Sequence, residues 1–159
     1  MSNGFRNMIT SKKKLLRPED MQGLRFRVME SPVYISMFKA LGAVPVTIPA
    51  TEVYLALQNG IVDGYDHPVL PYKTAKNYEV AKLVALTDHA YTPTPLLMNL
   101  KVFNGLAKPH QEAILQAAKG AADMELAYIT KAAERDTAGL RTLGVDFYDV
   151  DRRLFQQRV

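Results

Sequence analysis

Residues 23–68 read GLRFRVMESPVYISMFKALGAVPVTIPATEVYLALQNGIVDGYDHP, and this stretch indicates how the chain folds. Apolar and polar side chains alternate over residues 24–29, which is the period of a strand with one apolar face. The Ser-Pro pair at 31–32 suits the start of a helix, as N-cap and first helical residue. The stretch therefore predicts a strand followed by a helix, with Arg27 near the C-terminal end of the strand.

The second half of the stretch predicts a helix followed by a short strand. Thr51 is expected to cap a helix over residues 51–59, and a short strand is expected to begin at Ile61. The Asp-Gly pair at 63–64 is a turn or bend signal, and Tyr-Asp-His at 65–67 ends the strand just before a proline. Polar residues at the end of a strand again indicate the edge of a crevice.

Arg27 has two interpretations. Most arginines cover apolar surface with their stems or form surface ion pairs. In open α/β sheets, however, ligands bind at the carboxyl ends of the strands, where a guanidinium can hold a carboxylate through two parallel hydrogen bonds. The local pattern alone leaves both interpretations open.

The rest of the chain predicts an α/β domain. A strand is expected at 3–10 and carries Arg6, while a second strand that starts near residue 83 ends in Asp88 and His89. The other expected elements are an edge strand at 44–48, a helix over 71–82, a doubly buried strand LLMNL at 96–100, a helix over 109–143 and a last strand at 145–150. A helix of that length would span about 50 Å and should bridge two bodies.

Composition narrows the class of function. The chain has 159 residues, 48% of them hydrophobic, and a formal net charge of +4. This charge permits acidic ligands but is far from the dense basic stripe of a nucleic-acid binder, and the Lys12–Lys14 run is better read as a solvated loop. The absence of cysteine excludes disulfides, cysteine nucleophiles and thiolate zinc sites.

Acidic and histidine side chains at the strand ends suggest an alternative function. Two histidines, His67 and His89, with the carboxylates of Asp63, Asp66 and Asp88, supply the ligands for a hydrolytic metal site. The alternative is a metal-dependent hydrolase or lyase that uses Asp63, His67 and His89. The spacing matches no specific metal-ligand motif. What remains is a group of cations and hydrogen-bond donors at strand ends, as expected of a site for a small organic anion.

The motifs GLRFRVMESPVYISMFKALGAVPV, TEVYLALQNGIVDGYDHP and KNYEVAKLVALTDHAYTPTPLLMN resemble the extracytoplasmic solute-binding proteins of TRAP transporters, the DctP-type family. The resemblance implies a periplasmic-binding-protein-like fold, in which a mixed, mostly parallel sheet is flanked by helices and one long spine helix joins two lobes. It also implies a receptor for a small organic acid, delivered to membrane permease subunits, with no catalysis and no cofactor.

The resemblance also implies roles for individual residues. Arg27 matches the arginine that forms the main salt bridge to the ligand carboxylate, and Arg6 matches a second ligand-facing arginine. His67 lies where the family commonly has asparagine, in a motif that reads DGYDHP here. With Asp66 and His89, these residues form the expected ligand-binding set.

The same resemblance covers only the C-terminal portion of such a protein. Residues 4–92 with 133–159 are expected to form the second lobe, and residues 93–132 are expected to cross to the first lobe and include the start of the spine helix. The chain shows no apolar core of a signal peptide, whereas a complete member is periplasmic. An exposed first-lobe segment is expected to pair with a second copy of the chain and form a homodimer.

Overall fold

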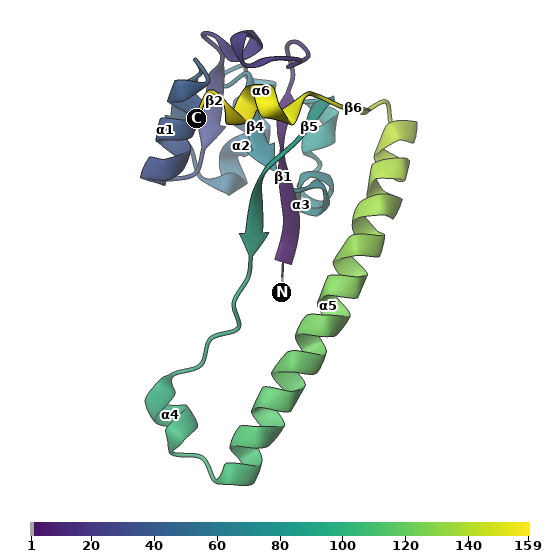
Figure 1. Cartoon of the computed structure of the whole chain (residues 1–159). Helices are drawn as coiled ribbons and strands as arrows, with labels where there is room; N and C mark the ends of the chain where they lie inside the picture. The colour runs from purple at the N-terminus through teal and green to yellow at the C-terminus, as the bar shows by residue number, and fades with distance from the viewer. Residues whose placement is uncertain (1) are drawn as a thin grey trace.

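A computed structural model describes residues 2–159 and has one six-stranded sheet in the order β3-β2-β4-β1-β5-β6 (Figure 1). The strands are β1 Ser2–Thr10, β2 Arg25–Val28, β3 Val44–Thr47, β4 Gly64–His67, β5 Leu83–Pro93 and β6 Asp146–Tyr148. The helices are η1 Pro18–Met21, α1 Pro32–Ala40, η2 Ala50–Glu52, α2 Val53–Gln58, α3 Val69–Thr74, η3 Asn77–Glu79, α4 Leu100–Asn104, α5 Lys108–Thr142 and α6 Arg152–Gln156.

The direction of the strands confirms the predicted mixed, mostly parallel sheet. β2 runs parallel to β3 and β4, and β5 runs parallel to β6. β1 runs antiparallel to both of its neighbours, β4 and β5. The carboxyl ends of β2 and β4 therefore lie side by side next to a strand that runs the opposite way, which places β1 residues within reach of both.

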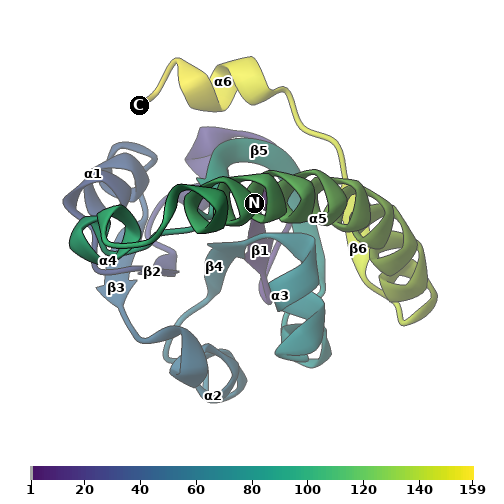
Figure 2. The same cartoon turned by 90° about the horizontal axis from the view of Figure 1, so that it is seen from below.

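Two apolar clusters cover the two faces of the sheet. One joins Ile9, Tyr65 and Val84 to α2, α3 and the last turns of α5. The other joins Met8 and Phe26 to α1 and α6. Figure 2 shows α2 and α3 on one side of the sheet and α6 on the opposite side. The strand ends are therefore held between two packed layers.

The long helix predicted over residues 109–143 is confirmed as α5, which has 35 residues. Only its C-terminal part is buried against the sheet and α3, through Ala132, Asp136 and Leu140. Asp136 also accepts hydrogen bonds from Lys73 (2.7 Å) and Arg135 (3.0 Å). The N-terminal part of α5 projects away from the sheet together with α4 (Figure 1). No helix among residues 2–159 combines the length and the apolar character that crossing a bilayer requires.

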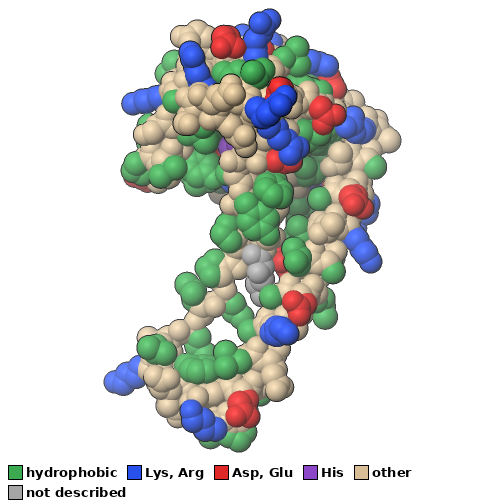
Figure 3. Space-filling view, viewed as in Figure 1, with side chains coloured by type: hydrophobic (Ala, Val, Ile, Leu, Met, Phe, Trp, Pro, Cys, Tyr) green, Lys and Arg blue, Asp and Glu red, His purple; other side chains and the backbone are tan. Residues whose placement is uncertain are grey.

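The predicted strand at 96–100 is wrong. Residues 94–99 have no regular structure, and Leu100 begins α4. Within residues 2–159 no strand pairs with this segment, so Leu96 and Leu97 remain 64% and 83% exposed. Hydrophobic side chains gather around α4 and the segment leading to it (Figure 3). An apolar run without a neighbouring strand cannot form the ladder that its composition favours.

The predicted helix over 71–82 is also wrong in extent. It divides into α3 and η3, because Lys76 adopts a left-handed φ of 56° between them. The side-chain amide of Asn77 then donates to the hydroxyl of Tyr65 (2.9 Å), and the hydroxyl of Tyr72 donates to the carbonyl of Ala81 (2.7 Å). Tertiary hydrogen bonds of this kind override a local helical pattern.

Two smaller predictions in the stretch 51–67 need correction. Thr51 lies inside η2 and does not cap a helix. Gly64 is the first residue of β4, not part of a turn before it, and a Cβ there would come within 2.6 Å of the Ile9 carbonyl oxygen and 2.7 Å of the Phe26 ring. The glycine is therefore required by close packing of β4 between β1 and β2.

Candidate functional site

Five polar side chains converge at the edge of the sheet where β2 and β4 end. They are the five residues expected from the sequence, Arg6 of β1, Arg27 of β2, Asp66 and His67 of β4, and His89 of β5. Arg6 and Arg27 are each only 4% exposed, and Asp66 is fully buried. The structure thus brings together residues that are up to 83 positions apart in the sequence, from Arg6 to His89.

Asp66 is the anion at the centre of this cluster. Its Oδ2 accepts a hydrogen bond from Nε of Arg6, and its backbone carbonyl accepts a second from Nη2 of Arg6 (2.7 Å). His89 Nε2 lies 3.3 Å from the same Oδ2. Burial would raise the pKa of Asp66, but the hydrogen bonds from His89 and Arg6 outweigh it and lower the pKa to about 2. Asp66 is therefore a carboxylate at neutral pH.

His89 is oriented by contacts on both ring nitrogens. Nδ1 lies 2.8 Å from the hydroxyl of Thr87, and the ring meets Phe38 edge-on with centroids 5.9 Å apart. Because a carboxylate only accepts hydrogen bonds, Nε2 carries the hydrogen that faces Asp66. His89 thus binds the same carboxylate oxygen of Asp66 as Arg6 does.

Arg27 is bound differently from Arg6. Its Nε donates to the backbone carbonyl of Ile48 (2.7 Å), and this is its one hydrogen bond to the protein among residues 2–159. Burial lowers the pKa of Arg27, while the carboxylate of Asp66 counteracts this and the charge of Arg6 adds to it. The guanidinium remains a cation, and its two terminal nitrogens are left as donors without an acceptor among the described residues.

His67 is the neutral member of the cluster. Burial, and next the charge of Arg6, lower its pKa to about 4. Its Nδ1 is buried and has no partner within the described chain. At neutral pH His67 therefore offers uncharged hydrogen-bonding groups between two arginines.

His67 should make the protein sensitive to acid. Because its folded pKa of about 4 lies below the ordinary 6.5, the unfolded chain binds a proton more readily between these pH values. We expect the free energy of unfolding to fall by about 3 kcal/mol as the pH drops from 6.5 to 4. His67→Asn should remove this part of the pH dependence in urea unfolding, whereas His110→Asn, at an exposed position on α5, should not. Equal acid sensitivity in both variants would contradict the assignment.

One aromatic side chain near the cluster was missed from the sequence. The ring of Tyr34, in the first turn of α1, lies 5.4 Å from the Cζ of Arg6. The helical spacing predicts that Tyr34 lies on a buried face, but it does not reveal that the ring covers an arginine from another strand. Tyr34 adds a flat face against which the Arg6 guanidinium can rest.

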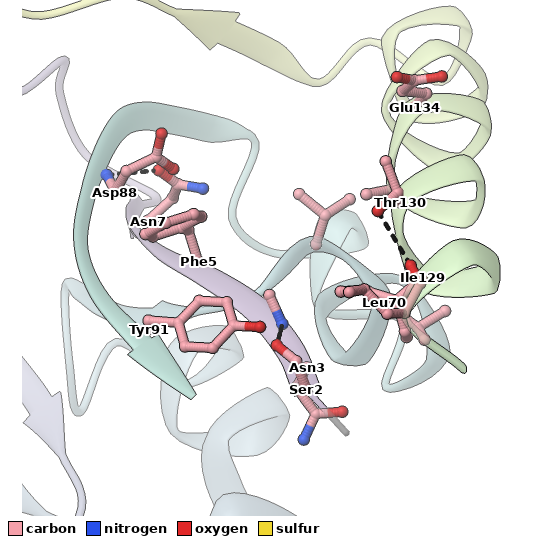
Figure 4. A pocket seen from close by; sticks show the side chains of 14 residues that line it. Ser2, Asn3, Phe5, Asn7, Leu70, Asp88, Tyr91, Ile129, Thr130 and Glu134 are labelled. Atoms are coloured by element: carbon pink, nitrogen blue, oxygen red, sulfur yellow. Dashed lines mark hydrogen bonds between the residues drawn. The ribbon is translucent and has the colours of Figure 1, made fainter. Parts of the chain in front are cut away.

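A mainly apolar cavity lies beside this cluster and does not include it. It has a volume of about 610 Å³ and lies between β1, β5, α3 and α5 (Figure 4). Most of its lining is apolar, with Phe5, Tyr91, Leu70 and Ile129 among the contributors. Neither arginine lines it, so the charged cluster is the better candidate for binding an acid.

A comparison with protein families identifies the family of the chain. The sequence profile of the bacterial extracellular solute-binding protein family 7, DctP, matches residues 1–159. The chain belongs to this family. As a class, family 7 consists of extracytoplasmic binding proteins, not enzymes, in agreement with the resemblance to TRAP solute-binding proteins seen in the sequence.

Individual relatives agree with the family 7 assignment. The chain is 33% identical to the 2,3-diketo-L-gulonate-binding periplasmic protein YiaO of Escherichia coli over 96% of this chain and 46% of that protein. It is 37% identical to a solute-binding protein of Verminephrobacter eiseniae over 96% of this chain and 46% of the relative. The chain therefore spans about half the length of the curated relatives that it matches.

Solved structures of TRAP periplasmic solute-binding proteins confirm the fold. One from Sulfitobacter, with bound β-D-galacturonate, has a TM-score of 0.93 at 29% identity over 99% of this chain and 52% of that chain. Another from Chromohalobacter salexigens, with bound D-glucuronate, has a TM-score of 0.95 at 27% identity and covers 99% of this chain and 53% of that chain. This coverage bears out the expectation that the family 7 chain corresponds to half of a two-lobe protein.

The alternative of a metal-dependent hydrolase or lyase finds no support in this family 7 chain. Asp63 does not join His67 and His89, because its carboxylate is held by Arg25 through Nε (3.1 Å) and Nη2 (2.9 Å). Among residues 2–159, no three His, Asp or Glu side chains are grouped closely enough to bind a metal ion. Asp63 instead fastens the loop before β4 to the start of β2.

Proposed function

We propose that this chain is the acid-binding half of a TRAP-type solute receptor, and that Arg27 is its anchor for the ligand carboxylate. The observation that carries the proposal is the state of the Arg27 guanidinium. It is buried, fixed through Nε by the carbonyl of Ile48, and left with two donors that no residue of the described chain uses. A planar fork with two unused donors matches the two oxygens of a carboxylate.

The charges of the cluster support a monoanionic ligand. Asp66 balances Arg6, and His67 is neutral because its pKa is about 4. Among residues 2–159, the positive charge of Arg27 therefore has no ion-pair partner of its own. Burying an unpaired charge is costly, and a ligand carboxylate would relieve that cost. We assign Arg27 to the carboxylate, and Arg6, His67, Asp66 and His89 to the polar wall beside it.

The ligands of the relatives favour a sugar acid. β-D-galacturonate, D-glucuronate and L-galactonate are bound in similar structures, and YiaO is named for 2,3-diketo-L-gulonate. Each is a six-carbon acid with several oxygen substituents. The neutral donor and acceptor groups of His67 suit a hydroxyl next to the carboxylate. We therefore infer that the ligand of this receptor is a hexuronate or a hexonate.

The lobe assignment and the setting of this receptor follow the same proposal. Residues 4–92 with 133–159 form the lobe that carries the arginines, and residues 93–132 belong to the other lobe, consistent with the projection of α4 and the start of α5 away from the sheet. The whole receptor works in the periplasm, passes its ligand to the membrane permease subunits and catalyses no reaction. The comparisons lend no support to the homodimer expected from the sequence.

Binding of D-galacturonate to this chain tests the proposal. The measurement is a two-dimensional NMR titration, which follows weak affinities such as those of a site with one wall. We expect shifts centred on the Arg27 Nε–H and on His67. The matched control is D-galactose, which has similar hydroxyl groups and no carboxylate, and it should cause no shifts. Equal responses to the two sugars would exclude a carboxylate anchor.

A further inference from the structure

β5 contains an irregularity next to the binding cluster. Two steps along β1, from Arg6 to Met8, are matched by five steps along β5, from Ala90 back to Ala85. The additional residues of β5 therefore leave the ladder between these points and form a bulge. Bulges next to binding sites often redirect a side chain, and this one contains Thr87, Asp88 and His89. His89 reaches Asp66 from this bulge.

Asp88 is the strained residue of the bulge. Its φ is +43°, a left-handed conformation that side-chain-bearing residues rarely adopt. Its backbone N–H donates to Oδ1 of the buried Asn7 (3.0 Å), as Figure 4 shows. A strained backbone persists only where surrounding contacts hold it, and such residues cluster at functional sites.

The C-terminal helix supplies the second contact that holds the bulge. Arg152, the first residue of α6, donates from Nε to the carbonyl of Leu86 (3.0 Å) and places Nη2 2.6 Å from the carboxylate of Asp88. One guanidinium thus binds the bulge at two points. α6 itself is fixed by Phe155, which is buried in the apolar cluster that includes Met8 and Phe26.

We propose that Arg152 and Asp88 are positioning residues of the acid-binding site, because together they hold the bulge in the shape that sets His89 against Asp66. The chain of contacts runs from Arg152 to Asp88, from the bulge to His89, from His89 to Asp66 and from Asp66 to Arg6. Neither residue belongs to the cluster of five. Only the ligand measurement below depends on the proposed function.

The solvent exposure of Arg152 and Asp88 allows a positioning role to be distinguished from a contribution to folding stability. The side chains of Arg152 and Asp88 are 49% and 27% exposed, and ion pairs in such surroundings contribute little to folding stability. Because Phe155 is buried in the apolar cluster, we expect α6 to stay docked when Arg152 is changed. We therefore expect Arg152→Ala to leave the chain folded and its urea midpoint close to the original, while the geometry around His89 changes.

The first test measures NMR signals of His89 and Arg6 in the absence of any ligand. The ¹⁵N chemical shifts of its two ring nitrogens report the hydrogen bonds to Thr87 and Asp66, and the Arg6 Nε–H signal reports the bond to Asp66. Arg152→Ala should shift all three signals. Asp88→Asn, which tolerates a left-handed φ and loses the charge, should reproduce these shifts, and the double variant should add little to them. Unchanged signals in Arg152→Ala would overturn the proposal.

The control variant is Arg153→Ala on the same helix. Arg153 pairs with Asp151 within its own turn and makes no hydrogen bond to the bulge within residues 2–159. It should leave the His89 and Arg6 signals as they are, and shifts as large as those of Arg152→Ala would overturn the proposal.

The second test is the D-galacturonate titration. We expect about tenfold weaker binding in Arg152→Ala and unchanged binding in Arg153→Ala. If the unmodified chain binds no uronate, the proposed function fails, while the His89 signals still decide the role of Arg152. Weaker binding in Arg152→Ala without any change at His89 or Arg6 would overturn the positioning role.

Discussion

Replacing Arg27 by lysine is expected to weaken the binding of D-galacturonate about 100-fold, which corresponds to about 3 kcal/mol. Lysine keeps the positive charge but has no planar fork. Its single ammonium group would have to serve both the carbonyl of Ile48 and the ligand carboxylate, which the guanidinium serves with separate nitrogens. The titration used for the unmodified chain measures this loss directly.

The matched control for Arg27 lies two residues earlier on the same strand. Arg25 is 44% exposed and binds Asp63, away from the cluster. Arg25→Lys makes the same chemical change on β2, so a general effect of losing a guanidinium should appear in both variants. We expect binding by Arg25→Lys to stay within about twofold of the original. Tight binding by Arg27→Lys would move the anchor away from Arg27 and reject the assignment.

Three of the five residues of the cluster could be predicted because they follow from strand ends. Asp66 and His67 come just before Pro68, and Arg27 lies four residues before the Ser-Pro pair at 31–32. Residues at the carboxyl ends of parallel strands meet at one edge of a sheet. The order of the strands adds Arg6, since β1 lies beside β4 in the sheet. Local pattern and sheet topology agree here, so the proximity of these residues follows without side-chain detail, while their role in ligand binding stays a prediction.

The contacts within the cluster could not be predicted, because they depend on register. Asp66 binds Arg6 and not Arg27, and nothing in the sequence distinguishes the two arginines in this respect. The bulge that lets His89 reach Asp66 is an offset between β1 and β5, and no alternation within β5 alone reveals it. The contacts of Arg152 could not be predicted either, because they depend on how α6 packs against this bulge.

The segment 96–100 shows the opposite error. LLMNL has the composition of a buried strand, but composition states a preference and does not supply a partner. A strand needs a neighbouring backbone, and β5 ends at Pro93 with no further strand beside this segment in the described chain. Predictions for exposed apolar runs therefore depend on which other strands lie beside them.

Removing the carboxylate of Asp66 is expected to destabilise the folded protein by about 3–5 kcal/mol at pH 7. Asp66→Ala leaves Arg6, only 4% exposed, without its charge partner and leaves His89 facing a void. An uncompensated buried charge costs more than the original pair contributes. Since domains are stable by only about 5–15 kcal/mol, urea unfolding should show a large loss. The control is Asp146→Ala, because Asp146 pairs with Lys14 at an exposed site and its loss should cost less than about 1 kcal/mol.

The pH dependence of unfolding tests Asp66 a second way. Its folded pKa of about 2 lies below the ordinary 3.8, so its carboxylate stabilises the folded state above pH 4, and that stabilisation is lost as the pH falls towards 2. The loss amounts to about 2.5 kcal/mol. Other acidic groups titrate in the same range, so the informative quantity is the difference between the unmodified chain and Asp66→Asn. That difference should shrink between pH 4 and pH 2, since protonation discharges Asp66 only in the unmodified chain. A difference that stays constant over this range would mean that Asp66 does not carry the charge that holds Arg6, and the anchor site would then need a different electrostatic account.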